Sequence, residues 1–479
     1  MNRVALRSTD HTPSRSPSCA YSFLVEVDAA GLAYQRVVFD LAVDGIALHS
    51  LEDDPVHWRL VATVWNQEAM DAAHRVLEAY FGHRLRRCVD RVVAVHRGGK
   101  IRTVATVPLA GAEDLALAYT PGVGRIANLI ARDRALVDDL TARANTIAVV
   151  TDGTAVLGLG NLGPEAALPV MEGKAALFDR LAGINAVPLC LATTDVDEIV
   201  ATVTAIAPSF GGVNLEDIAA PRCFEIERRL QAQLQIPVFH DDQHGTAIVV
   251  GAAVRNALRL VGKDLRSARI VVSGAGAAGT AVVRFLLALG VTDVVVSVPV
   301  GVLDPSLTML PPHKRWLAAH TNPRGIRGGI RDAVAGADVF IGVSGPGALP
   351  ADAVDTMATD AIVFALANPV PEVEPSAIGP RAAIVATGAS DDPNQINNIL
   401  AFPGVFRGAL DASAARITPA MKLAAWDALS ALGAEQGRLL PDVLDPDVVS
   451  VVAARVLAAA RADNSDPCLA LLETIGVAP

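Results

Sequence analysis

Short apolar runs alternate with amphipathic segments along most of the chain, and this rhythm predicts an α/β protein. In the second half, apolar runs that are typical of buried strands are separated by segments with apolar residues at helical spacing. These runs occupy residues 293–298, 337–343, 362–367 and 383–388. Strands that alternate with helices form a mostly parallel, doubly wound sheet, with ligand groups at the carboxyl ends of the strands.

The first hundred residues have a different pattern. The segment 21–52 alternates short apolar runs with a turn around Gly31, residues 58–65 form another strand candidate, and a helical spacing follows from Gln67. The order strand, helix, strand, strand, helix, strand is that of a small ferredoxin-like module. Its loops carry no catalytic cluster, so a structural appendage and a small-ligand regulatory module both remain open. The polar start before it predicts a disordered tail.

Composition narrows the class of protein. A chain of 479 residues, 52% of them hydrophobic, is long enough for roughly three domains. The net charge of −11 argues against a nucleic-acid-binding surface. The five cysteines have no CxxC spacing, and no apolar run reaches the length of a membrane span or a signal peptide. We therefore expect a cytoplasmic metabolic enzyme.

Two pairs of acidic residues follow two apolar runs. Glu216 and Asp217 come after the run 211–215, and Asp241 and Asp242 come after the run 236–240. Carboxylate oxygens suit Mg²⁺ or Mn²⁺, and a cation would relieve the repulsion between the pairs. The alternative is that Asp217 and Asp242 cap the N-termini of helices.

Tyr119 and Lys174 are candidates for proton transfer. Tyr119 precedes Thr-Pro-Gly, a break in regular structure from which its hydroxyl can project into a cleft; the alternative is a buried ring. Lys174 lies in an apolar helical run, where desolvation would depress its pKa and make it a base; the alternative is a lysine that extends to the surface. Upstream of it, strands are predicted at 147–150 and 156–159, with a turn between them.

A glycine motif opens the second half of the chain. It stands between an Ile-Val-Val strand and a long apolar helix, and it reads Gly274, Ala275, Gly276, Ala277, Ala278 and Gly279. In this context GxGxxG predicts a Rossmann-type dinucleotide site, although a structural glycine turn is the alternative. Asn368 stands at a strand end, and Asn398 lies in an asparagine-rich loop that offers amides to a polar ligand or to loop capping.

Several long motifs in one order resemble the short prokaryotic malic enzymes, from about residue 98 to about residue 460. The matching segments are AYTPGV, LPVMEGKAALF, GGVNLEDIAAPRCFEIE, IPVFHDDQHGTAIV, SGAGAAG and PNQINNILAFPGVFRGALD. The resemblance implies oxidative decarboxylation of malate to pyruvate with NAD⁺ or NADP⁺ and with Mg²⁺ or Mn²⁺. We also expect a homo-oligomer, a dimer or larger.

Site roles follow from the same resemblance, position by position. It implies that Tyr119 is the acid, that Lys174 is the base and a substrate contact, and that Asp241 orients the lysine. The remaining implied roles are metal binding by Glu216, Asp217 and Asp242, nucleotide binding by residues 274–279 and Asn368, and substrate binding by Asn398.

The N-terminal module resembles an ACT-type regulatory domain in its element order and in Gly31. We therefore expect four segments. They are a tail (1–19), an ACT-like domain (20–97), a malic catalytic domain (98–243) and an NAD(P)-binding domain with C-terminal helices (244–479).

Three departures from the family pattern leave alternatives open. The turn 297–300 has neither an acid for the ribose hydroxyls nor an arginine for a 2′-phosphate, and Asp304 further on is a substitute candidate. Ala155, Ala389 and Asp392 replace side chains that some relatives use near the substrate. A metal-dependent oxaloacetate decarboxylase with weak cofactor use and an inert ligand-sensing protein are the competing hypotheses.

Overall fold

The computed structural model describes residues 20–52, 54, 56–389 and 394–462. They belong to two compact units, which divide between Arg102 and Thr103. The predicted disordered tail and Asp392 lie outside the described residues.

The first unit has the predicted ferredoxin-like order. Its elements are β1 (Ser22–Asp28), α1 (Tyr34–Val43), β2 (Ala47–Glu52), β3 (His57–Thr63), α2 (Gln67–Phe81), β4 (Leu85–Asp90) and α3 (Arg91–His96). The antiparallel sheet has the order β2-β3-β1-β4. Val25, Leu41, Leu60 and Leu77 are fully buried between the sheet and the two longer helices, which explains the alternating apolar pattern of the strands. The predicted order of elements is confirmed.

The second unit begins with three short helices and a four-stranded parallel sheet. The helices are α4 (Ala112–Ala118), α5 (Gly122–Arg132) and α6 (Leu136–Leu140). The sheet has the order β6-β5-β7-β8, from strands β5 (Thr146–Thr151), β6 (Asn185–Cys190), β7 (Gly212–Leu215) and β8 (Val238–His240). The helices α7 (Pro164–Ala182), α8 (Val196–Ile206) and α9 (Arg222–Gln233) connect these strands.

The strand predicted at 156–159 is wrong. Val156 and Gly160 form only an isolated bridge, and Leu157 has a left-handed φ of 49°. The chain therefore turns back on itself here, and a turn with a left-handed residue does not continue as a strand.

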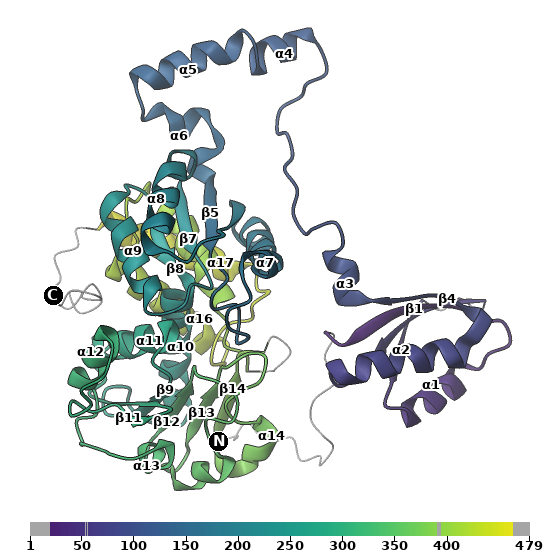
Figure 1. Cartoon of the computed structure of the whole chain (residues 1–479), viewed down its shortest axis with the longest axis vertical. Coiled ribbons are helices and arrows are strands. Elements are labelled where there is room, and N and C mark those ends of the chain that lie inside the picture. The colour runs from purple at the N-terminus through teal and green to yellow at the C-terminus, as the bar shows by residue number, and fades with distance from the viewer. Residues whose placement is uncertain (1–19, 53, 55, 390–393, 463–479) are drawn as a thin grey trace. The chain divides into compact units, whose positions relative to one another are not determined.

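The second part of this unit is built around a six-stranded sheet (Figure 1). Its order is β11-β10-β9-β12-β13-β14, from β9 (Arg269–Ser273), β10 (Asp293–Val298), β11 (Gly301–Val302), β12 (Val339–Gly342), β13 (Ile362–Ala365) and β14 (Ile384–Thr387). Every pairing is parallel except β10 with β11. The strand order reverses at β9 and β12, which is the switch point where doubly wound sheets bind ligands. The predicted fold class is confirmed.

Helices cover both faces of this sheet. They are α10 (Asp241–Leu260), α11 (Ala277–Ala288), α12 (Pro312–His320), α13 (Ile330–Val334) and α14 (Pro375–Ile378), followed by α15 (Phe402–Asp411), α16 (Pro419–Glu435) and α17 (Asp447–Arg461). One apolar core joins α10, α11 and helices α15–α17 to Phe178 of α7 and Phe239 of β8, and a second core lies on the opposite face of the six-stranded sheet. Helix α15 also packs against α7, which covers β5 and β6, so α15 connects the six-stranded domain to the parallel four-stranded sheet.

None of the helices within the described ranges is both long and apolar enough to span a bilayer.

Candidate active site

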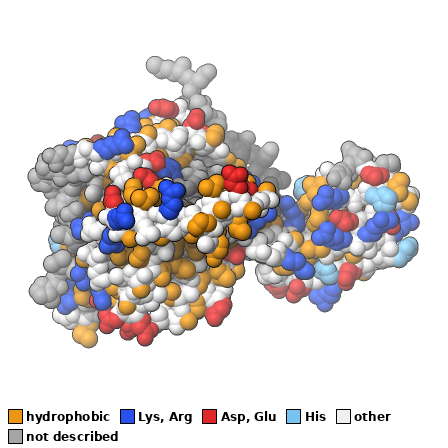
Figure 2. All heavy atoms as spheres, turned by 90° about the horizontal axis from the view of Figure 1, so that it is seen from above, with side chains coloured by type: hydrophobic (Ala, Val, Ile, Leu, Met, Phe, Trp, Pro, Cys, Tyr) orange, Lys and Arg blue, Asp and Glu red, His pale blue; other side chains and the backbone are white. Residues whose placement is uncertain are grey.

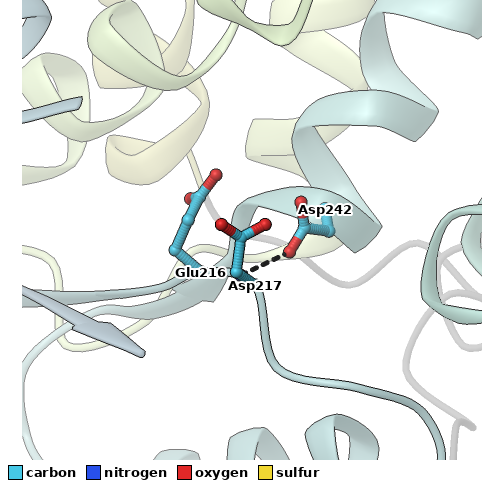
Figure 3. A group of neighbouring side chains, drawn as sticks. All are labelled: Glu216, Asp217 and Asp242. Atoms are coloured by element: carbon cyan, nitrogen blue, oxygen red, sulfur yellow. Dashed lines mark hydrogen bonds between the residues drawn. The ribbon is translucent and has the colours of Figure 1, made fainter. Parts of the chain in front are cut away.

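Three carboxylates converge at one edge of the four-stranded sheet. Glu216 and Asp217 follow β7 directly, and Asp242 lies in the first turn of α10 after β8. Because β7 and β8 are parallel neighbours, their carboxyl ends meet at the same edge. One oxygen from each carboxylate lies within 4.8 Å of the others, and Figure 3 shows the three groups side by side.

The helix-capping alternative is wrong for both aspartates. The N-cap of α10 is His240, and the Asp242 carboxylate accepts the backbone N–H of Asp217 at 2.8 Å. Asp217 itself has a left-handed φ of 53° and lies well before α9, which begins at Arg222. The Asp242 carboxylate therefore binds the backbone of Asp217, and neither aspartate is the N-cap of a helix.

The electrostatics of the group fit a hard divalent cation. Burial, together with the charges of Asp242 and Glu216, raises the pKa of Asp217 to about 9. The Oδ2 atom of Asp217 is buried and has no hydrogen-bond partner among the described residues. Two buried carboxylates, a half-buried third and an oxygen without a partner form the oxygen donor set that Mg²⁺ or Mn²⁺ prefers.

Lys174 reaches this group from the middle of α7. Its Nζ donates to Asp241 Oδ2 at 2.5 Å and lies 2.9 Å from Glu216 Oε1, and the side chain is only 7% exposed. The same Nζ lies 4.0 Å from the centre of the Phe402 ring. The alternative of a surface lysine is therefore wrong.

The predicted depressed pKa of Lys174 is also wrong. Burial disfavours the ammonium, but the charges of Asp241 and Glu216 outweigh that effect and raise the pKa above its ordinary value. The apolar residues next to Lys174 in the sequence belong to α7. The carboxylates of Glu216 and Asp241, which raise the pKa, come from distant parts of the chain and could not be seen in that local pattern.

Asp241, directly after β8 of the parallel four-stranded sheet, is hydrogen-bonded to Asn398 of the domain that contains the six-stranded sheet. Its buried Oδ2 accepts hydrogen bonds from Lys174 and from Asn398 Nδ2, the latter at 2.6 Å. Burial raises the pKa of Asp241 to about 8, although the charge of Lys174 opposes the rise. A Cβ at Gly245 would lie 1.8 Å from Asp241 Oδ1, so only glycine leaves room for this carboxylate. Asn398 opens a short 3-10 helix (Asn398–Leu400) of the six-stranded sheet's domain.

Tyr119 is not brought to this group. It ends α4, its side chain is 65% exposed, and its hydroxyl has no hydrogen-bond partner among the described residues. The alternative of a buried ring is therefore wrong, and the ring lacks the contact with Lys174 that a shared active site requires.

The glycine motif has the geometry of a dinucleotide loop. Gly274 has φ 115° and faces Val343 O, which a Cβ would meet at 2.5 Å; a Cβ at Gly279 would meet Gly274 O at 2.1 Å. Gly276, at the N-cap of α11, has open space where its side chain would lie. The loop therefore combines a tight turn, close helix packing and an accessible helix N-terminus at the switch point, as a pyrophosphate requires.

The other positions predicted to contact the cofactor follow other strands of the six-stranded sheet. Asn368 follows β13, and its Nδ2 donates to Gly388 O at 3.4 Å. A Cβ at Gly158 would lie 1.5 Å from the backbone oxygen of Asn368. The turn after β5 therefore packs closely against the loop after β13. The 297–300 segment is a hairpin in which Val300 is 78% exposed. Asp304 accepts the backbone N–H of Ser306 at 2.8 Å.

Sequence reasoning missed a buried carboxylate behind the metal-ligand residues. Glu227 accepts hydrogen bonds from the backbone N–H of His240 and from Gln243 Nε2, and His244 Nε2 lies 2.9 Å from it. Lys422 Nζ lies 3.1 Å from the other nitrogen of His244. This network holds the start of α10, which carries Asp241 and Asp242. The available signal was a glutamate on the apolar face of an amphipathic helix, between Ile226 and Leu230.

A doubly wound dinucleotide fold, whose neighbouring sheet carries a buried lysine among carboxylates that fit a divalent cation, is typical of NAD(P)-linked oxidoreductases. Residues 98–231 match the family "Malic enzyme, N-terminal domain", and residues 313–461 match "Malic enzyme, NAD binding domain". The chain belongs to the malic enzyme family.

Individual relatives agree with this assignment. An NAD-dependent malic enzyme of Geobacillus stearothermophilus is 46% identical over 436 residues, which is 90% of each chain. A bifunctional malic/malolactic enzyme of Bacillus subtilis is 50% identical over 76% of this chain and 90% of its own. The crystal structure of an NAD-dependent malic enzyme from Thermotoga maritima has a TM-score of 0.74 and 47% identity, and covers 77% of this chain and 99% of its own.

Proposed function

We propose that this protein oxidises malate and decarboxylates the product to pyruvate and CO₂, with reduction of NAD⁺ or NADP⁺ and with Mg²⁺ or Mn²⁺. The observation that carries the proposal is the position of Lys174 Nζ, within 2.9 Å of Glu216 and 2.5 Å of Asp241. A proton-transfer group thus lies beside the carboxylates that fit a cation, and the two sheets of the second unit meet at this point.

Lys174 is the base of the oxidation step. In its neutral form it would take the proton of the malate hydroxyl, and a bound divalent cation would favour that form by offsetting the carboxylate charges that raise the lysine pKa. A bound NAD⁺ or NADP⁺ would supply the hydride acceptor. Asp241 holds the Lys174 side chain from one side, and its hydrogen bond with Asn398 Nδ2 leaves the asparagine oxygen for substrate-side contacts. Both partners belong to rigid elements, which supports their role in positioning the lysine.

Glu216, Asp217 and Asp242 would hold the cation, which would supply a Lewis acid at the substrate carbonyl. Loss of CO₂ then leaves an enolate that must receive a proton at carbon. The resemblance to the family supports Tyr119 as the acid for this step, because a phenol can donate a proton to carbon; within a single chain Tyr119 is exposed and does not contact Lys174.

Residues 274–279 would hold the pyrophosphate of the cofactor, and the family resemblance places Asn368 beside the cofactor as well. We propose a modest preference for NAD⁺ or none at all. The exposed hairpin at 297–300 offers neither an acid that would repel a 2′-phosphate nor a cation that would bind it. An unpaired phosphate dianion is expensive to desolvate, and this consideration favours NAD⁺.

We propose the domain division 20–97, 98–243 and 244–479, with an ACT-like regulatory role for the first domain. The Geobacillus alignment is longer than the second unit of this chain, so it extends into the first unit. The ferredoxin-like order of that unit supports a small-ligand site. The reaction is assigned to the cytoplasm, where scattered cysteines stay reduced.

A substrate comparison tests the proposal. The protein is incubated with Mn²⁺ and either malate plus NAD⁺, malate plus NADP⁺, or oxaloacetate alone, while reduced cofactor and pyruvate are measured. A malic enzyme forms both products from malate in equal amounts. An oxaloacetate decarboxylase forms pyruvate from oxaloacetate without oxidising malate, and an inert ligand sensor forms neither product.

A further inference from the structure

We propose that Arg284, together with Thr280 and His313, forms an anion-binding site between α11 and α12, and that this site takes a small oxyanion such as inorganic phosphate. The site adjoins the glycine motif of residues 274–279 but is separate from the cofactor and from the carboxylates that fit a cation. The inference goes beyond the proposed function, because it concerns a group that the proposed reaction does not use.

Arg284 carries a buried positive charge without an acidic partner among the described residues. It lies in α11 and is only 2% exposed. Burial lowers its pKa to about 10, and no charge of a described side chain contributes to the shift, so the guanidinium stays charged at neutral pH. Its Nε and Nη1 atoms are buried and have no hydrogen-bond partner in the described part of the chain. An uncompensated buried charge is expensive, and an anion would relieve this cost.

A second arginine that stacks on a tryptophan shows the contrast. Arg255 lies 4.7 Å from the centre of the Trp426 ring, is exposed, and donates to Asp427 Oδ1 at 3.0 Å. Figure 2 likewise shows surface Lys and Arg side chains with acidic side chains distributed among them. Arg284 lies 4.0 Å from the centre of the Trp316 ring, which offsets part of the cost of burial but supplies no negative charge. The stack therefore accounts for the packing of Arg284 and not for its charge.

The contacts of α12 bring two more polar side chains to this region. Thr280 precedes Arg284 by four residues, so both lie on the same face of α11. His313 and Trp316 are three residues apart and share a face of α12. His313 shares a hydrogen bond with the backbone of Ala275, which comes just before α11. Trp316 stacks on Arg284, so Thr280 lies between these two contacts along α11.

Both added side chains have unused hydrogen-bonding atoms. Thr280 Oγ1 and His313 Nδ1 are buried and have no hydrogen-bond partner among the residues that the structure describes. The ring centre of His313 lies 5.1 Å from that of Phe224 on α9, which packs against the imidazole. Burial lowers the pKa of His313 to about 4, and the positive charges of Lys314 and Arg284 lower it as well. The region therefore combines positive charge with guanidinium and hydroxyl donors, which are the groups that bind oxyanions.

Burial limits the anion to a small one. Thr280 is fully buried, and Trp316 covers the guanidinium of Arg284. A phosphate that is attached to a nucleotide could not reach these side chains without displacing α12. A free oxyanion requires only a transient opening of this helix, and the donors of an arginine match phosphate oxygens in geometry.

Calorimetric titration with inorganic phosphate tests the site. Saturating NAD⁺ and Mg²⁺ occupy the cofactor and metal positions, and potassium chloride of equal ionic strength is the reference. Arg284→Met keeps an apolar side chain under Trp316 but removes the charge. It should weaken phosphate binding at least about tenfold, because a hydrogen bond to a charged group contributes at least that much. Arg255→Met is the matched control and should leave binding unchanged. Equal affinity in the wild type and Arg284→Met overturns the inference, and so does an equal loss in both variants.

Urea unfolding gives a second measurement that does not involve malate turnover. In chloride, Arg284→Met should unfold at a urea concentration no lower than the wild type, because it removes an uncompensated charge. Phosphate in place of chloride should raise the midpoint of the wild type and of Arg255→Met, but not that of Arg284→Met. A wild type that does not respond to phosphate overturns the site.

Arg284→Lys decides the case if Arg284→Met does not fold. The lysine keeps the positive charge but loses the fixed donors of the guanidinium. Weaker phosphate binding than in the wild type supports the site, and equal binding overturns it.

Discussion

Replacing Lys174 by alanine removes the group on which the proposed reaction depends. Lys174 is 7% exposed, and its Nζ contacts two carboxylates. The substitution therefore leaves the buried carboxylates of Asp241 and Glu216 without the positive charge of the lysine. Breaking a buried ion pair in this way costs about 3–5 kcal/mol of folding stability. Loss of a general base lowers the rate by about 10²- to 10⁴-fold, which corresponds to about 2.7–5.5 kcal/mol of transition-state free energy.

Lys174→Arg separates these two effects. The guanidinium keeps a positive charge between the carboxylates but does not release its proton, so it is expected to recover most of the stability and none of the turnover. The assay combines urea unfolding of the metal-free protein with initial rates of reduced-cofactor formation from malate at saturating Mn²⁺. Turnover by Lys174→Ala within tenfold of the wild type would refute the assignment of the base.

Three further predictions concern the cation and the cofactor. Asp242→Asn removes one of three anionic ligands, so calorimetric titration should show Mn²⁺ binding at least about tenfold weaker, near 1.4 kcal/mol, and an unchanged isotherm contradicts the ligand set. Gly279→Ala places a Cβ about 2.1 Å from Gly274 O, so it should raise the KM for the cofactor and lower the unfolding free energy by about 1–3 kcal/mol; unchanged values show that the loop is not fixed as described. The ratio of kcat/KM for NAD⁺ and NADP⁺ should stay below about a hundredfold, or 2.7 kcal/mol, and a larger ratio shows that another group reads the ribose.

The predictable parts of this fold have local causes. Strands and helices of the second half follow from apolar periodicity, and the glycine motif follows from its place between a strand and a helix. The two acidic pairs meet because their strands, β7 and β8, are parallel neighbours. Pattern alone could therefore predict the cluster of carboxylates, although it could not exclude helix capping.

The parts that sequence could not predict depend on contacts between distant residues. The raised pKa of Lys174 comes from carboxylates at positions 216 and 241, which no local pattern pairs with it. The turn at Leu157 resembles a strand in composition, but it is fixed by the hydrogen bond to Asp217. Glu227 was overlooked because its partners lie on α10, beyond its own helix.

The most direct test of the central claim is the initial rate of malate oxidation as a function of free Mn²⁺, with reduced cofactor and pyruvate measured together. The account predicts a saturable dependence on Mn²⁺, equal amounts of the two products, and no rate after chelation. A rate that does not depend on the cation, or reduced cofactor formed without pyruvate, would contradict a reaction at Lys174 and the carboxylates of Glu216, Asp217 and Asp242.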